Sequence, residues 1–214
     1  MKTKEYYDLL QKPLKEMKKT RPDVCFKRIA AELINNYCIN CNGKEFYLAE
    51  IEFYYYQDNS NGIMNKPWNM VTYARTGKKV GELFYHLSGV DICFDSYYEN
   101  GSAQFGGILI RSVIDEGNKL ITGPLNCKNL LLNACNDHMP KLERIKKRIG
   151  PKDCCLSTRR LLGKKDMENK IDYPFNLCFY DGNIKDWNTD NDWYDKKTNH
   201  IKMIHKKYDI NRPY

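Results

Sequence analysis

The sequence predicts an α+β fold, because helical and strand patterns occupy different parts of the chain. Apolar residues recur at helical spacing in the first 36 residues, and runs of aromatic and branched residues follow them. The 214 residues can build one sizeable core, and no repeat or low-complexity linker divides them. We therefore expect one domain over 1–214, with a helical extension at 1–21 and a polar tail at 183–214.

Three helices are expected from apolar spacing and proline positions. The first covers 4–19 and is broken or staggered at Pro13, because proline disturbs a helix interior. A second, amphipathic helix has Pro22 in its first turn and continues to Asn36. A third opens at Gly123-Pro124, where free N–H groups can bind a phosphate.

The strands are predicted from short runs of aromatic and branched residues between turn residues. The Asn42-Gly43 pair is typical of a tight turn and precedes the most apolar strand. A polar turn at 97–102 and a long loop at 57–80 separate other elements. The predicted strands are 45–56, 82–86, 90–95, 105–114 and 174–180.

Three charged residues inside these strands are the first candidates for function. Strict alternation places Glu50 and Glu52 on one face of the strand at 45–56, together with Leu48 and Tyr54. A carboxylate held on a rigid strand suits a general base that acts on water, although the stretch alone favours a solvated sheet face as the explanation of both glutamates. Arg111 also interrupts an apolar run and needs an anionic partner, which an internal salt bridge would supply.

The net charge of +8 favours a polyanionic partner such as nucleic acid. The chain has 16 tyrosines, which suit stacking on unpaired bases but also fill β cores. The cluster Lys146, Lys147 and Arg148 is a candidate for phosphate binding, with a solvated basic face as the alternative.

Cofactors and membrane spans are not expected. The nine cysteines and four histidines form no convincing metal-ligand spacing, even though Cys38 and Cys41 are three residues apart. We therefore expect reduced, buried thiols and neither a metal nor another cofactor. No apolar run is long enough for a bilayer, and the N-terminus lacks the apolar core of a signal peptide, so we expect a cytoplasmic protein.

The order of motifs between residues 22 and 182 resembles the alkyladenine (3-methyladenine) DNA glycosylase family. In that family an amphipathic helix and a short hairpin precede a Val-Glu-Thr-Glu-Ala-Tyr strand, and a Gly-Pro pair later opens a helix. The stretches that carry the resemblance are Ala49-Glu50-Ile51-Glu52-Phe53-Tyr54, Tyr85-His86-Leu87-Ser88-Gly89-Val90, Gly107-Ile108-Leu109-Ile110-Arg111-Ser112-Val113, Gly123-Pro124 and Tyr173-Pro174-Phe175.

The resemblance implies a curved antiparallel sheet with surrounding helices and a monofunctional DNA glycosylase, a monomer without cofactor. Such an enzyme flips a modified base out of DNA and hydrolyses its N-glycosidic bond, which leaves an abasic site. The matching residues are Glu52 as the base that activates water, Arg111 beside that water, and Tyr54 and Tyr85 as rings on either side of the flipped base.

The chain also departs from the family pattern. The family's histidine is missing from the loop Asp58–Gly62. Its wedge tyrosine falls at about Ser88, which is small for a wedge, so the expected wedge is Leu87 with Ser88, and His86 is the alternative to Leu87. His86 and Asp95 complete the expected base pocket. An acidic Asp95 where the family has asparagine favours a differently modified base, in repair or in defence against foreign DNA. A catalytically silent nucleic-acid-binding protein and a purely structural ion network are the alternatives.

Overall fold

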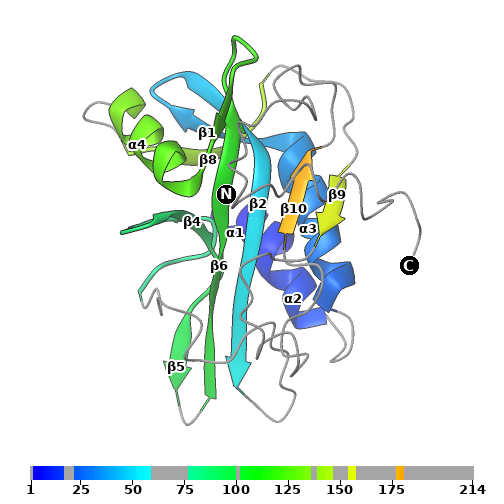
Figure 1. The fold of residues 1–214 in the computed structure, drawn as a ribbon. Helices are drawn as coiled ribbons and strands as arrows, with labels where there is room; N and C mark the ends of the chain where they lie inside the picture. Colours follow the sequence, from blue (N-terminus) through cyan, green and yellow to red (C-terminus); the bar gives the residue numbers. More distant parts are fainter. Residues whose placement is uncertain are drawn as a thin grey trace, which may run out of the picture.

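The computed structural model has an α+β fold in which helices surround a curled antiparallel sheet (Figure 1). This confirms the predicted fold class. The structure describes residues 2–16, 22–58, 77–99, 102–135, 139–146, 154–157 and 177–180. Most of the predicted loop at 57–80 and the whole tail at 183–214 lie outside these residues. No helix among them is long and apolar enough to cross a bilayer.

The N-terminal helix continues through Pro13 instead of breaking there. It consists of α1 (Lys2–Tyr6), a π-helical turn η1 (Tyr7–Gln11) and α2 (Lys12–Glu16). The Lys12 N–H donates to the carbonyl of Tyr7, five residues earlier. Proline has no N–H and its ring clashes with the carbonyl four residues earlier. The wider π turn changes the bonding register just before the proline, so the predicted irregularity is present without a break.

The second predicted helix and the turn after the first strand are confirmed. Helix α3 covers Pro22–Asn36 and leads directly into β1 (Tyr37–Cys41). Asn42 and Gly43 have φ angles of 51° and 90° and connect β1 to β2 (Lys44–Asp58). Positive φ at both central residues matches the twist of a two-residue hairpin, which explains the choice of asparagine and glycine.

The sheet is antiparallel in every described pair and follows the order β3-β4-β6-β2-β1-β8. Beside β2 lies β10, which pairs with β9, while β5 and β7 pair with β6. The remaining strands are β3 (Leu83–His86), β4 (Gly89–Cys93), β5 (Tyr97–Glu99), β6 (Ser102–Ile114), β7 (Leu120–Thr122), β8 (Lys141–Arg144), β9 (Cys154–Ser157) and β10 (Leu177–Tyr180).

Two sequence predictions about the strands need correction. The polar turn expected at 97–102 is the end of a hairpin, since Tyr97–Glu99 pairs with the start of β6. The basic segment after Pro140 begins with β8, which pairs with β1. Three of the four residues of this short edge strand, Lys141, Glu143 and Arg144, are charged, and this composition conceals the strand in the sequence. The third predicted helix is confirmed as α4 (Pro124–Cys135).

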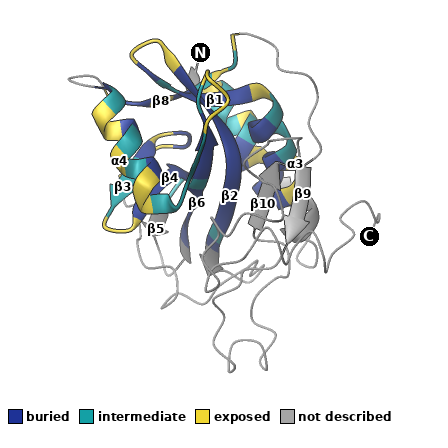
Figure 2. Cartoon of the chain, turned by 45° about the horizontal axis from the view of Figure 1, so that its top comes forward, coloured by how far each residue is buried: buried dark blue, intermediate teal, exposed yellow. Residues whose placement is uncertain are grey.

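Aromatic packing joins α3 to the sheet, whose central strands β2 and β6 are buried along most of their described length (Figure 2). The ring of Phe26 stacks on Phe53 with 4.6 Å between centroids. Leu48 belongs to the same core cluster as Ile51 and Phe53, although strict alternation predicts opposite faces. The pairing of β2 with β6 shifts register on both sides of Glu50, and this bulge reverses the alternation.

The N-terminal helix closes the opening between the two end strands of the curled sheet. Tyr6 donates its hydroxyl to the carbonyl of Leu142 on β8. Its ring also lies against Gly81, where an added Cβ would come within 2.4 Å of a ring carbon. A hollow of about 450 Å³ lies at this position, next to Lys78 and Met139. The first helix therefore covers the opening between β3 and β8, which we call the seam of the sheet.

This contact makes Gly81 a test of the seam. Gly81→Ala places a side chain at a φ of +82° and against the ring of Tyr6. We expect strain of about 1–2 kcal/mol from the backbone and about 1–3 kcal/mol more from overpacking. Gly77→Ala is the matched control, because Gly77 has a φ of +80° with no atom within 4 Å. Urea denaturation of both variants measures the difference, and equal losses would contradict the seam contact.

Candidate functional site

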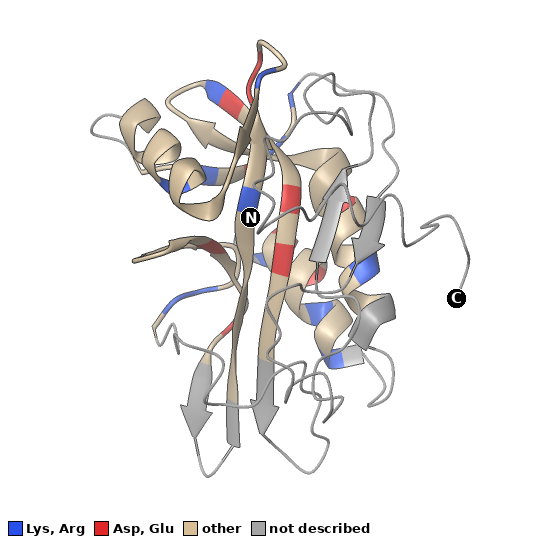
Figure 3. Cartoon of the chain, in the orientation of Figure 1, with Lys and Arg blue, Asp and Glu red and all other residues tan. Residues whose placement is uncertain are grey.

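The charged residues predicted from the strands meet on one face of the sheet. Figure 3 shows two acidic positions on β2 beside a basic position on β6. Arg111 Nη1 donates to Glu52 Oε2 at 2.7 Å, and Arg111 Nε donates to Glu50 Oε1 at 3.2 Å. The predicted anionic partner of Arg111 is therefore a pair of glutamates, one of which is the predicted general base.

Two hydroxyl groups complete this arrangement. Tyr54 donates its hydroxyl to Glu52 Oε1 at 3.0 Å, and Ser112 donates to Glu50 Oε2 at 2.8 Å. All four carboxylate oxygens of Glu50 and Glu52 thus accept a hydrogen bond, and bonded carboxylates hold a fixed orientation. Tyr54, expected as a stacking ring, also positions the carboxylate through its hydroxyl.

The bulge in β2 explains why both Arg111 and Ser112 reach Glu50. Glu50 pairs with Ser112, and the next pair is Ile51 with Ile110, so the register steps over Arg111. Bulges redirect side chains and are frequent beside functional sites. In a regular strand Arg111 and Ser112 would point to opposite faces. The bulge is what brings both donors to Glu50.

Burial of this group is almost complete. Glu50 and Glu52 are each 1% exposed, whereas the Arg111 side chain retains 16% exposure. Buried carboxylates are costly unless cations and hydrogen bonds compensate them. The guanidinium is therefore the part of the group closest to solvent, and the carboxylates lie beneath it.

A second polar cluster lies on the same face, at the hairpin between β3 and β4. His86 Nε2 is 3.3 Å from Asp91 Oδ1, and its other ring nitrogen is 3.1 Å from Ser88 Oγ. Asp91 pairs with Leu109, and Leu109 pairs with Glu52. Side chains directly opposite in antiparallel strands project to one face. The structure therefore brings His86 onto the face that carries Glu52.

Tyr85 is not on this face. It precedes His86 in β3, and successive residues point to opposite sides of a strand. Tyr85 packs against the core, and its buried hydroxyl has no hydrogen-bond partner among the described residues. Burial raises the pKa of this hydroxyl, and the nearby thiols of Cys41 and Cys135 add to the effect. The structure does not bring Tyr85 together with Tyr54 around one base.

Asp95 also lies apart from Glu52. Its Oδ1 accepts the N–H of Val80, and its own N–H donates to Gln11 Oε1 on the N-terminal helix. These contacts fix the chain after β4 against η1. Within the described residues, Asp95 thus serves the packing of the seam instead of the predicted base pocket.

The hairpin tip presents an exposed apolar side chain. Leu87 is 84% exposed on the two-residue turn between β3 and β4. Lys128 on α4 donates from Nζ to the carbonyls of His86 and Leu87, at 3.0 and 2.9 Å. The tip is therefore braced from behind while Leu87 projects outward. Of the two predicted wedge residues, Leu87 has the reach and Ser88 bonds back to His86.

Of the predicted basic cluster, the structure describes Lys146 alone. Lys146 is exposed, and its backbone N–H donates to Glu45 Oε1. Lys147 and Arg148 lie outside the described residues. Asp91 and Lys128 were not predicted from the sequence. Asp91 could have been found, since it is a charged residue inside an apolar strand, as Arg111 is.

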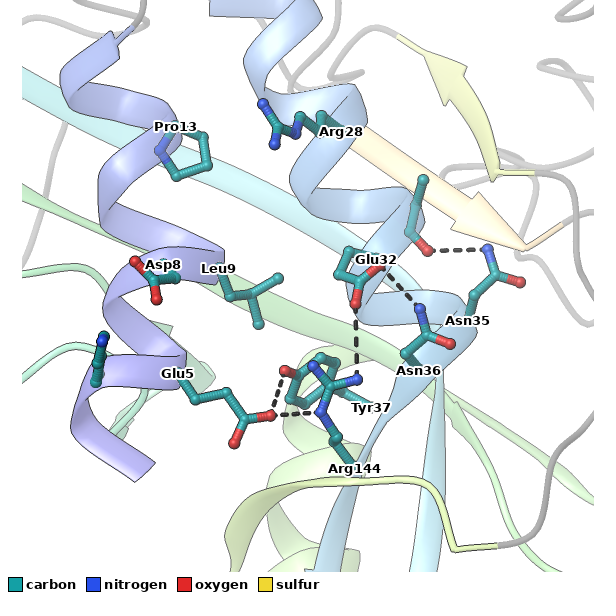
Figure 4. Close-up of a pocket in the computed structure, with 12 residues that line it drawn as sticks. Glu5, Asp8, Leu9, Pro13, Arg28, Glu32, Asn35, Asn36, Tyr37 and Arg144 are labelled. Carbon is teal, nitrogen blue, oxygen red and sulfur yellow. Dashed lines mark hydrogen bonds and ion pairs between the residues drawn. The ribbon is translucent and has the colours of Figure 1, made fainter. Parts of the chain in front are cut away.

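A hollow lies elsewhere, between the N-terminal helix and α3 (Figure 4). It has a volume of about 830 Å³ and mixes acidic and basic side chains. Arg144 lies over the ring of Tyr37 at 5.0 Å and forms an ion pair with Glu5 at 2.5 Å. This hydrogen bond raises the pKa of Arg144, while burial is the main cause of the raised pKa of Tyr37. No predicted site residue lines it.

Six cysteines are free and buried, namely Cys25, Cys38, Cys41, Cys93, Cys127 and Cys135. Burial raises the pKa of Cys25, Cys38 and Cys127 to about 12, so these groups remain neutral thiols at physiological pH. No group of three or more potential metal ligands occurs in the described part of the chain.

Comparisons with known proteins found no matching family model, no matching curated protein and no matching solved structure.

The role of Arg111 in stability can be measured by removing its charge. Arg111→Met leaves Glu50 and Glu52 buried without their shared cation, and we expect a loss of about 3–5 kcal/mol in the free energy of unfolding. Arg144→Met removes an arginine that is 60% exposed and should cost less than about 1 kcal/mol. Urea denaturation compares the two. Equal, small losses would show that Arg111 does not balance the carboxylates.

Proposed function

We propose that the protein is a monofunctional DNA glycosylase in which Glu52 activates the water that hydrolyses the N-glycosidic bond of a flipped base. The observation that carries this proposal is the Glu52 carboxylate, held on a β-strand by Arg111 on one oxygen and by Tyr54 on the other. A general base must first lie within hydrogen-bonding reach of the proton that it accepts, and a suitable pKa is the second requirement. Both anchors lie on rigid strands, which hold catalytic groups better than loops do.

In this reaction the oxygen of water attacks the anomeric carbon of the sugar, and Glu52 accepts the proton that water loses. The bond between the sugar and the base breaks, and the base leaves with the bonding electrons. Arg111 lies next to the carboxylate and is the more exposed of the two, so it can contact both the water and a nucleotide phosphate. Tyr54 supplies one ring against the base, and Tyr85 does not supply the other.

The hairpin tip supports DNA as the substrate. An enzyme that extracts a base must compensate for lost stacking, and apolar side chains inserted between base steps do so. Leu87 is exposed at a tip whose carbonyls Lys128 holds. The net charge of +8 favours association with the phosphate backbone. Leu87 is therefore proposed as the wedge that occupies the gap left by the base.

The burial of the carboxylates favours a second candidate, a nucleic-acid-binding protein without catalytic activity. Glu50 and Glu52 are each 1% exposed, and buried ion networks also occur as purely structural features. This candidate keeps the wedge and the basic charge but forms no abasic sites.

Glutamine substitutions distinguish the two candidates, because they keep the shape of the side chain and remove the charge. We expect Glu52→Gln to slow base release by about 10²- to 10⁴-fold and to leave DNA binding intact. Glu50→Gln is the matched control, since it alters the same arginine contact without altering the proposed base. The assay incubates modified duplexes with each variant and reveals abasic sites with alkali. Release by Glu52→Gln at the wild-type rate would refute the proposed base.

The wedge has its own test. Leu87→Ala should slow base release from a fully paired duplex at least tenfold, because the cost of unstacking a base is a few kcal/mol. The same variant should act normally on a modified base in single-stranded DNA, where no stack must be opened. Leu125→Ala removes an exposed leucine from α4 and should leave both rates close to wild type. Equal losses on both substrates would contradict a wedge role.

A further inference from the structure

We infer that the hollow between the N-terminal helix and α3 is a binding site for a short peptide with free termini, whose carboxylate binds Arg28 and whose ammonium group binds Asp8 (Figure 4). Its volume of about 830 Å³ lies within the usual range of ligand sites. None of the described residues that line it belongs to the group around Glu52 or to the hairpin that carries Leu87. The inference is therefore independent of the proposed glycosylase activity.

The two helices provide an apolar surface inside the hollow. Leu9 and Pro13 line it from the N-terminal helix, and Ala31 lines it from α3. Alanine has a single methyl group as its side chain, so α3 contributes to the wall without filling the space. These side chains suit the carbon skeleton of a ligand, while polar groups in such a site fix its orientation.

Arg28 presents an exposed guanidinium to the hollow. Glu32 follows it by four residues, which is the spacing of an ion pair on one helix face. Glu32 instead accepts a hydrogen bond from Asn36 Nδ2 at 2.9 Å and lies 3.9 Å from Arg144. Arg28 forms no ion pair with the side chains that the structure describes, and it extends from α3 toward the N-terminal helix (Figure 4). Its planar fork of donors can therefore bind a carboxylate through two hydrogen bonds.

Asp8 supplies the opposite charge from the facing helix. It is exposed, lies in the π-helical turn η1 and forms no ion pair within the part of the chain that the structure describes. Glu5, three residues earlier, differs in this respect, because it accepts hydrogen bonds from Tyr37 at 2.7 Å and from Arg144 at 2.5 Å. Of these two carboxylates, Asp8 is the one that can receive an ammonium group from a ligand.

The balance of charges in the hollow favours a zwitterion. Among the described lining residues, three are cations and three are acids, namely Lys4, Arg28, Arg144, Glu5, Asp8 and Glu32. A phosphate dianion would bring two negative charges close to three carboxylates, and like charges at short range repel. A zwitterion brings one charge of each sign and leaves the balance unchanged. A peptide with free termini is a ligand of this kind.

The separation of the two charges favours a peptide over a single amino acid. Arg28 and Asp8 belong to facing helices, and the axes of packed helices lie about 8–10 Å apart. A free amino acid carries both charges on one carbon atom and cannot bridge such a gap. An extended tripeptide spans about 10 Å and can place one terminus at each helix. Its side chains would then lie against the apolar surface.

The test uses the tripeptide Ala-Leu-Ala with free termini, in its N-acetylated form and in its C-amidated form. Isothermal titration calorimetry measures the affinity of each form for the whole 214-residue chain. Each blocked form should bind weaker than the free peptide by about tenfold or more, because it lacks one of the two charged contacts. Arg28→Gln should cause a similar loss with the free peptide and remove the effect of C-amidation. Asp8→Asn should do the same for N-acetylation.

Lys27→Gln is the matched control, since Lys27 is the exposed neighbour of Arg28 on α3 and does not line the hollow. It should bind the free peptide as the wild type does, and thermal melting establishes that all three variants are folded. Equal losses in Lys27→Gln and Arg28→Gln would overturn the inference, as would the absence of binding at millimolar peptide. Equal binding of the N-acetylated form would also overturn it, because the site would then recognise the C-terminus of a longer chain. Base release enters none of these measurements, so the glycosylase proposal is tested separately.

Discussion

The contact of one guanidinium with two buried carboxylates constrains the rest of the sheet. Arg111 lies on β6 and both glutamates lie on β2, so the ion group crosses the most extensive strand pair of the fold. Neither carboxylate would be stable at 1% exposure without a cation at hydrogen-bonding distance. The bulge around Glu50 is the backbone adjustment that allows this contact while Leu48, Ile51 and Phe53 remain in the core.

The bulge at Glu50 gives the two faces of β2 different surroundings. On one side of the sheet α3 stacks its aromatic ring on Phe53. On the other side the polar residues of β2 face the arginine. A strand in strict alternation would place Leu48 with the glutamates, where its burial would add nothing to the core. The shifted register gives each face a uniform character, apolar toward α3 and ionic away from it.

Local patterns predicted most of the fold, and long-range pairing explains what they missed. Helix α3, the Asn42-Gly43 turn and strand β6 follow from periodicity and turn chemistry, which involve neighbours in sequence. Strand β8 is stabilised by its pairing with β1, about a hundred residues away, and its highly charged composition hides it.

The candidate site could be predicted in part for the same reason. Charged residues inside apolar strands identified Glu52 and Arg111, and the structure joins them. The same criterion would have found Asp91. Alternation alone separates Tyr85 from His86, so both could not have faced one base. The bulge and the seam contacts of Asp95 depend on partners distant in sequence, and no local pattern indicates them.

The sheet holds two polar groups on one face, Glu52 with Arg111 and Asp91 with His86. Loops can vary the distance between their side chains, but hydrogen-bonded strands fix it. Asp91 and Glu52 share Leu109 as a neighbour, so their separation is set by backbone pairing and not by side-chain choice. Substitutions at either group therefore change its chemistry without changing the spacing. The fold therefore holds the two groups in a constant frame.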